Sequence, residues 1–120
     1  MKQNRRLKRR HLIYYLRVFE KNADQPIGHV VDITIEGMML ISEDPIKTDT
    51  VFELRMVLPV EIEGSREITF SAMSRWCRED ENPDFYNTGF QLIHPSSVHI
   101  KIIEHLIRKF CFKEPLDRLY

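Results

Sequence analysis

Alternating apolar and polar residues, interrupted by turn-forming residues, fill most of the chain from Leu12 to Ile93. In an extended strand successive side chains point to opposite faces, so this alternation predicts strands that bury one face. Their many β-branched and aromatic residues favour the same interpretation. The pattern predicts six strands, at residues 12–20, 29–35, 38–42, 51–59, 67–78 and 85–93.

The hydrophobic period changes near residue 96. From there apolar residues recur every three or four positions, the spacing of one face of an α-helix: Val98, Ile102, Ile103, Leu106, Ile107 and Phe110. Ser96 and Ser97 are both good N-caps, and Arg108 and Lys109 stand favourably near the C-terminal end. We therefore predict an amphipathic helix within residues 96–112 that packs over the strands.

Six short strands with no helix between them are typical of an antiparallel barrel or sandwich, and not of alternating β-α-β units. A chain of 120 residues with 42% hydrophobic residues is sufficient for one core without help from disulfides or metal. The sequence shows no internal repeat and no low-complexity linker. A single mainly β domain is therefore expected.

The basic residues are unevenly distributed in a chain whose 18 basic and 18 acidic side chains cancel. Residues 1–17 contain seven of the basic side chains and no acidic one, which leaves 11 basic against 18 acidic side chains in the rest. A basic N-terminal segment on an acidic body indicates a local binding site for anions, and not a surface for long polyanions.

Several classes of function have no signature in this sequence. There is no G-x-S-x-G, no H-E-x-x-H and no glycine-rich phosphate loop, so we predict neither an enzyme nor a cofactor. The five histidines lack ligand spacing, and the two cysteines, 34 positions apart, are expected to be small buried hydrophobes, so no metal site is predicted. No apolar run approaches the ~20 residues that span a bilayer, so we do not expect membrane insertion. We expect a cytoplasmic location.

The basic segment repeats an Arg-x-x-x-Arg spacing, once as Arg5 with Arg9 and once as Arg6 with Arg10. Two guanidinium groups four positions apart can converge on one ligand, whether the segment is helical or wraps around that ligand. Each can bind a pair of phosphate oxygens or the O6/N7 edge of guanine. From these residues alone, a solvated tail, a nucleic-acid arm and a small-ligand site all remain open.

A second polar pair lies in the segment DITIEG, where Asp32 and Thr34 stand two positions apart. In an extended chain both would project from one face, opposite Val31, Ile33 and Ile35. A carboxylate can accept two parallel hydrogen bonds from the N1–H and N2–H groups of guanine, and a hydroxyl can donate to a phosphate. Gly37 then suits a positive-φ turn that allows close approach of a ligand. Taken alone, the segment is equally an ordinary strand that ends in a turn.

Together the two motifs resemble the signature of the PilZ domain, a bacterial receptor for cyclic di-GMP. That signature is R-x-x-x-R just before the first strand, followed by D/N-x-S-x-x-G at a strand end. The six strands, a late NTGFQLI segment and the closing helix resemble the family as well. The resemblance implies a mainly β fold, a six-stranded antiparallel β-barrel with a C-terminal α-helix. Residues 1–11 would form a basic N-terminal arm and residues 12–120 the single domain.

The resemblance also implies roles for the arginines. Arg6 and Arg10 would clamp phosphates and guanine, although Arg5 with Arg9 satisfies the same spacing, so the register stays open. In the family, an arginine at the position of Arg5 tends to accompany an intercalated pair of ligands. One or two ligands per site are therefore both considered.

For the second motif, the resemblance implies that Asp32 holds a guanine edge and that Gly37 shapes the turn. Thr34 stands where the family usually has serine, which preserves the hydroxyl but adds a methyl group beside the ligand. We expect binding to be retained. Trp76 could stack on a base, but a lone tryptophan in a strand is more often core or helix-packing surface, and we leave it outside the predicted site.

The sequence is compatible with three functions. The first is a cyclic di-GMP receptor whose arm becomes ordered on binding and changes its contact with an unidentified partner protein. The second is a PilZ-like module that only binds another protein. The third, which the acidic body disfavours, is a barrel that binds single-stranded nucleic acid through the arm and the aromatic residues Tyr14, Tyr15 and Trp76.

Overall fold

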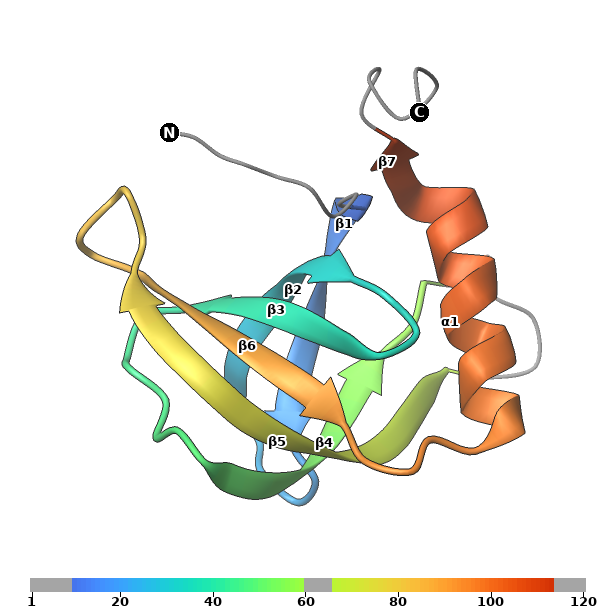
Figure 1. The fold of residues 1–120 in the computed structure, drawn as a ribbon, viewed down its shortest axis with the longest axis horizontal. Coiled ribbons are helices and arrows are strands. Elements are labelled where there is room, and N and C mark those ends of the chain that lie inside the picture. Colours follow the sequence, from blue (N-terminus) through green and yellow to red (C-terminus); the bar gives the residue numbers. More distant parts are fainter. Residues whose placement is uncertain (1–9, 60–65, 114–120) are drawn as a thin grey trace.

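An antiparallel β-barrel with one helix forms the described part of the chain (Figure 1). The computed structural model describes residues 10–59 and 66–113, and at residues 10–15 and 110–113 it describes the backbone alone. The elements are β1 (Arg10–Glu20), β2 (Pro26–Ile33), β3 (Gly37–Ser42), β4 (Thr50–Val57), β5 (Glu67–Glu79), β6 (Tyr86–Leu92), α1 (Ser97–Phe110) and β7 (Cys111–Lys113). The predicted six-stranded antiparallel β-barrel with a C-terminal helix is confirmed.

The strands are hydrogen-bonded in the order β2-β3-β6-β5-β4-β1-β7, and a further pairing of β2 with β1 closes the barrel. Strand β1 is therefore central, because it pairs with β2 and, on its other edge, with β4 and β7. The short β7 was not predicted. The helical pattern had extended to residue 112, but α1 ends at Phe110 and the next three residues pair with Arg10–Leu12.

Strand boundaries differ from the prediction at two places. Strand β1 begins at Arg10, two residues early, because its first residues pair with both β2 and β7. Strand β2 begins at Pro26, in a stretch expected to be a loop, and it ends at Ile33, before the predicted end at residue 35. Cross-strand partners on β1 continue β2 across Pro26 and Gly28, which turn propensity alone would have assigned to a loop.

The core consists of the inward side chains of all six barrel strands together with two residues of α1, Ile103 and Leu106. Ser96 caps the helix, since its Oγ accepts a hydrogen bond from the backbone N–H of His99 at 3.1 Å. Val98, which the helical pattern placed on the buried face, is 62% exposed. The helix thus buries its later turns and leaves its first turn at the surface.

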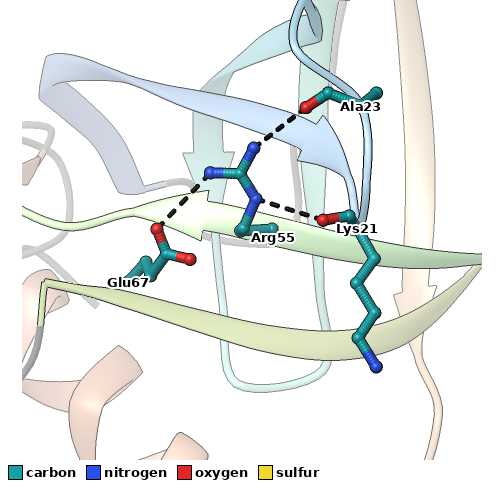
Figure 2. Close-up of polar contacts among 4 residues, drawn as sticks. All are labelled: Lys21, Ala23, Arg55 and Glu67. Carbon is teal, nitrogen blue, oxygen red and sulfur yellow. Dashed lines mark hydrogen bonds and ion pairs between the residues drawn. The ribbon is translucent and has the colours of Figure 1, made fainter.

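Arg55 on β4 fastens the turn between β1 and β2 (Figure 2). Its Nε donates to the carbonyl oxygen of Lys21 at 3.3 Å, and its Nη2 donates to that of Ala23 at 3.0 Å. Its Nη1 lies 3.4 Å from a carboxylate oxygen of Glu67. The guanidinium also covers the ring of Phe19 at 4.3 Å from the centroid. One side chain therefore joins β1, the turn, β4 and β5.

Thr88 on β6 carries a hydroxyl that is enclosed in the protein. The residue is fully buried, and within the described ranges its Oγ1 has no hydrogen-bond partner. Because an unsatisfied buried hydroxyl opposes folding, Thr88→Val should raise the free energy of unfolding by about 1 kcal/mol. Thr50→Val is the matched control, since the Thr50 hydroxyl donates to the Thr48 carbonyl oxygen at 2.9 Å and its loss should destabilise. Urea unfolding of both variants measures the two signs; a destabilised Thr88→Val would contradict the expectation.

Candidate functional site

A β-bulge near the end of β2 decides where Asp32 lies. Val30 pairs with Leu40 and Asp32 pairs with Met39, so two residues of β2 stand opposite one residue of β3. Val30 and Ile33 are consequently both buried although they are three positions apart. The predicted apolar face of alternate residues is thus wrong in detail: Val31 is the half-buried bulge residue, and Asp32 keeps an outward position because of it.

Thr34 lies in the turn that follows β2 rather than in the strand, so the alternation predicted across Asp32 to Ile35 stops at Ile33. Its hydroxyl oxygen accepts hydrogen bonds from the backbone N–H groups of Glu36 at 3.1 Å and Gly37 at 3.2 Å. Its own N–H donates to the Gly37 carbonyl oxygen at 2.8 Å. Ile35, expected on the buried face, is 43% exposed for this reason. Within the turn, the hydroxyl that serine or threonine supplies holds the backbone.

Gly37 is required by close packing and not by an unusual backbone angle. Its φ lies outside the left-handed region, so the expected positive-φ turn is wrong. A Cβ on Gly37 would lie 2.3 Å from the carbonyl oxygen of Phe90 on the paired strand β6. A glycine at this position therefore lets the turn lie directly against β6, and the N–H of Leu92 donates to the Glu36 carbonyl oxygen at 2.9 Å.

The start of β1 runs alongside Asp32. His11 and Asp32 are cross-strand partners, so Arg10, the last arginine of the basic segment, precedes the residue opposite that carboxylate. The next pair along the two strands is Leu16 with Val30. From one pair to the other there are five positions on β1 but only two on the antiparallel β2, so the pairing is irregular there. The irregular stretch separates the start of β1 from the regular barrel ladder.

The predicted site residues are brought together only in part. The backbone of Arg10 and the residues Asp32, Thr34 and Gly37 lie at one edge of the barrel, where β1 begins and β2 turns into β3 (Figure 1). Arg5, Arg6 and Arg9 lie outside the described residues, as does the side chain of Arg10. The binding role of the arginines therefore stays a prediction, and the choice between Arg5 with Arg9 and Arg6 with Arg10 stays open.

Trp76 is a feature that the sequence reasoning set aside. It does not belong to the core but lies on the outer face of β5, where its cross-strand partner is Gly89. Gly89 is also the partner of Met39, and Met39 is the partner of Asp32, so one row of residues crosses β2, β3, β6 and β5. The signal that could have found this arrangement is the glycine in NTGF opposite a strand tryptophan, because a glycine offers the flat surface that an indole ring covers.

Other chemistries find little support in the described residues. Residues 10–59 and 66–113 contain no group of three His, Cys, Asp or Glu side chains close enough to share a metal ion. Cys77 is a half-buried free thiol. In the same ranges, α1 falls short of the length and hydrophobicity that a bilayer-spanning helix requires.

The fold and this edge define a small β-barrel domain with a group of polar residues near the start of its first strand. The family model of the PilZ domain matches residues 3–111, and the chain belongs to this family. The search of curated protein sequences returned no match.

Solved structures with the same fold include three proteins of low sequence identity. The PilZ domain of YcgR from Escherichia coli, solved with c-di-GMP, has a TM-score of 0.65 at 14% identity, over 90% of this chain and 92% of that one. The inhibitor of motility MotI/DgrA from Bacillus subtilis has a TM-score of 0.66 at 16% identity, over 90% of this chain and 52% of that one. MrkH of K. pneumonia in its apo state has a TM-score of 0.65 at 18% identity, over 92% and 52%. The chain thus spans about half the length of MotI/DgrA and MrkH.

Proposed function

We propose that this PilZ domain is a receptor for cyclic di-GMP that signals by ordering its N-terminal arm and changing its contact with a partner protein. The observation that carries the proposal is the pairing of His11 with Asp32. It brings the end of the arginine motif beside the carboxylate motif, although 22 positions separate Arg10 from Asp32 in the chain. Family membership and the fold shared with the c-di-GMP-bound YcgR domain support the same ligand.

The chemistry of the site suits a guanine dinucleotide. A carboxylate such as that of Asp32 can accept hydrogen bonds from the N1–H and N2–H donors of a guanine edge, while adenine lacks that pair of donors. The arginines of Arg5–Arg10 supply forked donors for phosphate oxygens and for the guanine O6/N7 edge. Thr34 and Gly37 hold the turn that places Asp32, and they contribute shape more than direct contacts.

Signalling would follow from the charge of the arm. Six basic residues between Lys2 and Arg10, without an acidic neighbour, repel one another until phosphates and guanines neutralise and bridge them. The ordered arm, the ligand and the outer barrel face would then form a new surface for a partner protein. We propose no catalytic step.

Calorimetry with cyclic di-GMP tests the proposal. Asp32→Ala, Arg6→Ala and Arg10→Ala should each weaken binding by about tenfold to hundredfold, the value of one charge-assisted hydrogen bond. The sign for Asp32 is informative, because removing a negative charge near an anionic ligand would strengthen binding if electrostatics alone acted. Asp84→Ala, which removes an exposed carboxylate from the β5–β6 loop, is the charge control and should change affinity by less than about threefold.

Amide exchange on the same samples tests the switch. Residues 4–9, which precede β1, should gain protection at saturating cyclic di-GMP, and unchanged protection would exclude ordering of the arm. A titration with no heat and no competition would favour the interaction-only module. Steep loss of affinity with salt for single-stranded RNA or DNA would instead favour the nucleic-acid binder, since a long polyanion releases many counterions.

A further inference from the structure

The outer face of the barrel carries a tryptophan fixed across the neighbouring strand. A Cβ on Gly89 would lie 2.3 Å from both Cε2 and Nε1 of the Trp76 indole. The ring therefore occupies the space above β6 and leans from β5 towards Met39, the other partner of Gly89. Any larger residue at position 89 would have to push the indole away from the sheet.

Arg78 lies over this indole. It is two positions after Trp76 on the same face of β5, and its Cζ is 4.7 Å from the ring centroid. The side chain is exposed. Stacking on tryptophan restricts a guanidinium that would otherwise sample many rotamers, so its position is largely set before any ligand arrives.

Arg55 and Arg78 differ in how many of their N–H groups have an acceptor within the described part of the protein. Arg55 is also stacked on a ring, that of Phe19, but its Nε, Nη1 and Nη2 are all directed at protein acceptors (Figure 2). For Arg78, the described residues supply the indole contact and neither a hydrogen bond nor an ion pair. A guanidinium with five N–H donors is thus held in place while its donors face solvent.

The carboxylate two positions after Arg78, that of Asp80, does not pair with Arg78. Asp80 accepts hydrogen bonds from the side-chain Nδ2 of Asn87 at 2.8 Å and from the backbone N–H of Asn82 at 3.1 Å. The Asn87 hydrogen bond is the main cause that lowers the pKa of Asp80. Asn87 is itself the cross-strand partner of Arg78. The Asp80 carboxylate therefore binds the side-chain amide of Asn87 and not the guanidinium of Arg78.

We propose that Arg78, positioned by Trp76 and Gly89, is a further ligand-binding residue that takes the second guanine base of the nucleotide by stacking on it. This inference rests on the proposed function and extends that site across the barrel face. Asp32 and Arg78 share the outer face on strands three places apart, about 14 Å across the sheet at ~4.8 Å per strand, and Arg78 stands two positions along β5 from the row of Asp32, about 7 Å more. The indole leaning over β6 and the long arginine side chain shorten that gap. A molecule with two guanines can then place one at Asp32 and the other on the guanidinium, whose other face rests on Trp76.

Calorimetry of three variants tests the role of Arg78. Arg78→Ala should weaken cyclic di-GMP binding by about tenfold or more. Arg78→Lys should lose most of the same affinity, because lysine keeps the charge but offers no plane for stacking. Arg75→Ala removes the same charge from the same strand, but that guanidinium faces the sulfur of Met73 at 3.1 Å, and its loss should cost less than about threefold. Equal losses for Arg78→Ala and Arg75→Ala, or an unchanged Arg78→Lys, would overturn the proposal.

Trp76 supplies an independent signal because it is the single tryptophan of the chain. Cyclic di-GMP should change its fluorescence in the wild type and in Arg75→Ala, and the change should be lost in Arg78→Ala. Urea unfolding confirms that the exposed substitutions leave the fold intact. If the wild type fails to bind, the proposed function itself fails. If the wild type binds and Asp32→Ala weakens binding, but Arg78→Ala changes neither the affinity nor the fluorescence response, only the extension of the site to Arg78 is refuted.

Discussion

Arg55→Ala is expected to lower the free energy of unfolding by about 2 to 4 kcal/mol, the largest stability effect of a single side chain that we predict. The guanidinium donates to the carbonyl oxygens of Lys21 and Ala23, and both bonds are charge-assisted. It also covers Phe19, a residue that is 7% exposed. Truncation removes these contacts together, and water can replace only the polar ones. Urea unfolding measures the loss.

The ion pair of Arg55 with Glu67 should contribute little to that effect. The carboxylate side chain is 44% exposed and the N–O distance is 3.4 Å, so Glu67→Gln should cost no more than about 1 kcal/mol. Arg55→Lys keeps the charge but not the fork, and it should fall between the two. A Glu67→Gln variant as unstable as Arg55→Ala would show that the ion pair, and not the turn contacts, is responsible. Because the turn lies at the end of the β1–β2 hairpin away from the pair of His11 with Asp32, folded Arg55→Ala should bind cyclic di-GMP normally.

Gly37→Ala is expected to destabilise the protein by about 1 to 3 kcal/mol and to weaken ligand binding as well. The added Cβ would meet the carbonyl oxygen of Phe90, a backbone atom in a paired strand that cannot rotate away. The turn from Thr34 to Gly37 would have to move, and Asp32 directly precedes this turn in β2. Unfolding and calorimetry on one preparation report both effects.

Gly28→Ala is the graded control for that prediction. Its Cβ would meet the carbonyl oxygen of Ile41 at 2.7 Å, a milder overlap than the 2.3 Å at Gly37. Gly28 also lies four positions before Asp32 in β2, away from the turn. A smaller loss of stability and a nearly unchanged affinity are therefore expected. If Gly28→Ala harms binding as much as Gly37→Ala does, the turn has no special role in placing the carboxylate.

Most elements of the fold could be predicted because their signals are local. Alternation of apolar and polar residues depends on the geometry of one strand, and it located all six barrel strands within a few residues. The three- and four-residue spacing after Ser96 located α1, and the serine itself proved to be the cap. Strand β7 was not predicted because three residues are too few to show a periodic pattern. These residues form a strand because they pair with the edge of β1 at its start.

The residues of the candidate site could be named from the sequence, but their arrangement could not. The motifs singled out Asp32, Thr34 and Gly37, yet alternation assigned the wrong neighbours to them because a bulge adds one residue to β2. The hydroxyl of Thr34 was expected to face a ligand, and it instead accepts hydrogen bonds from its own turn. Trp76 was excluded on its general preference for cores, because the sequence does not reveal that its partner is a glycine.

The sequence by itself determined the strands, the helix and the family, since each follows from spacing within a short segment or from a short motif. The tertiary structure alone decided which segments lie side by side. Register between strands is set by the whole barrel, and a shift of one residue would move every later side chain to the opposite face. The pairing of His11 with Asp32, and the row from Asp32 through Met39 to Gly89, therefore exist only in the folded chain.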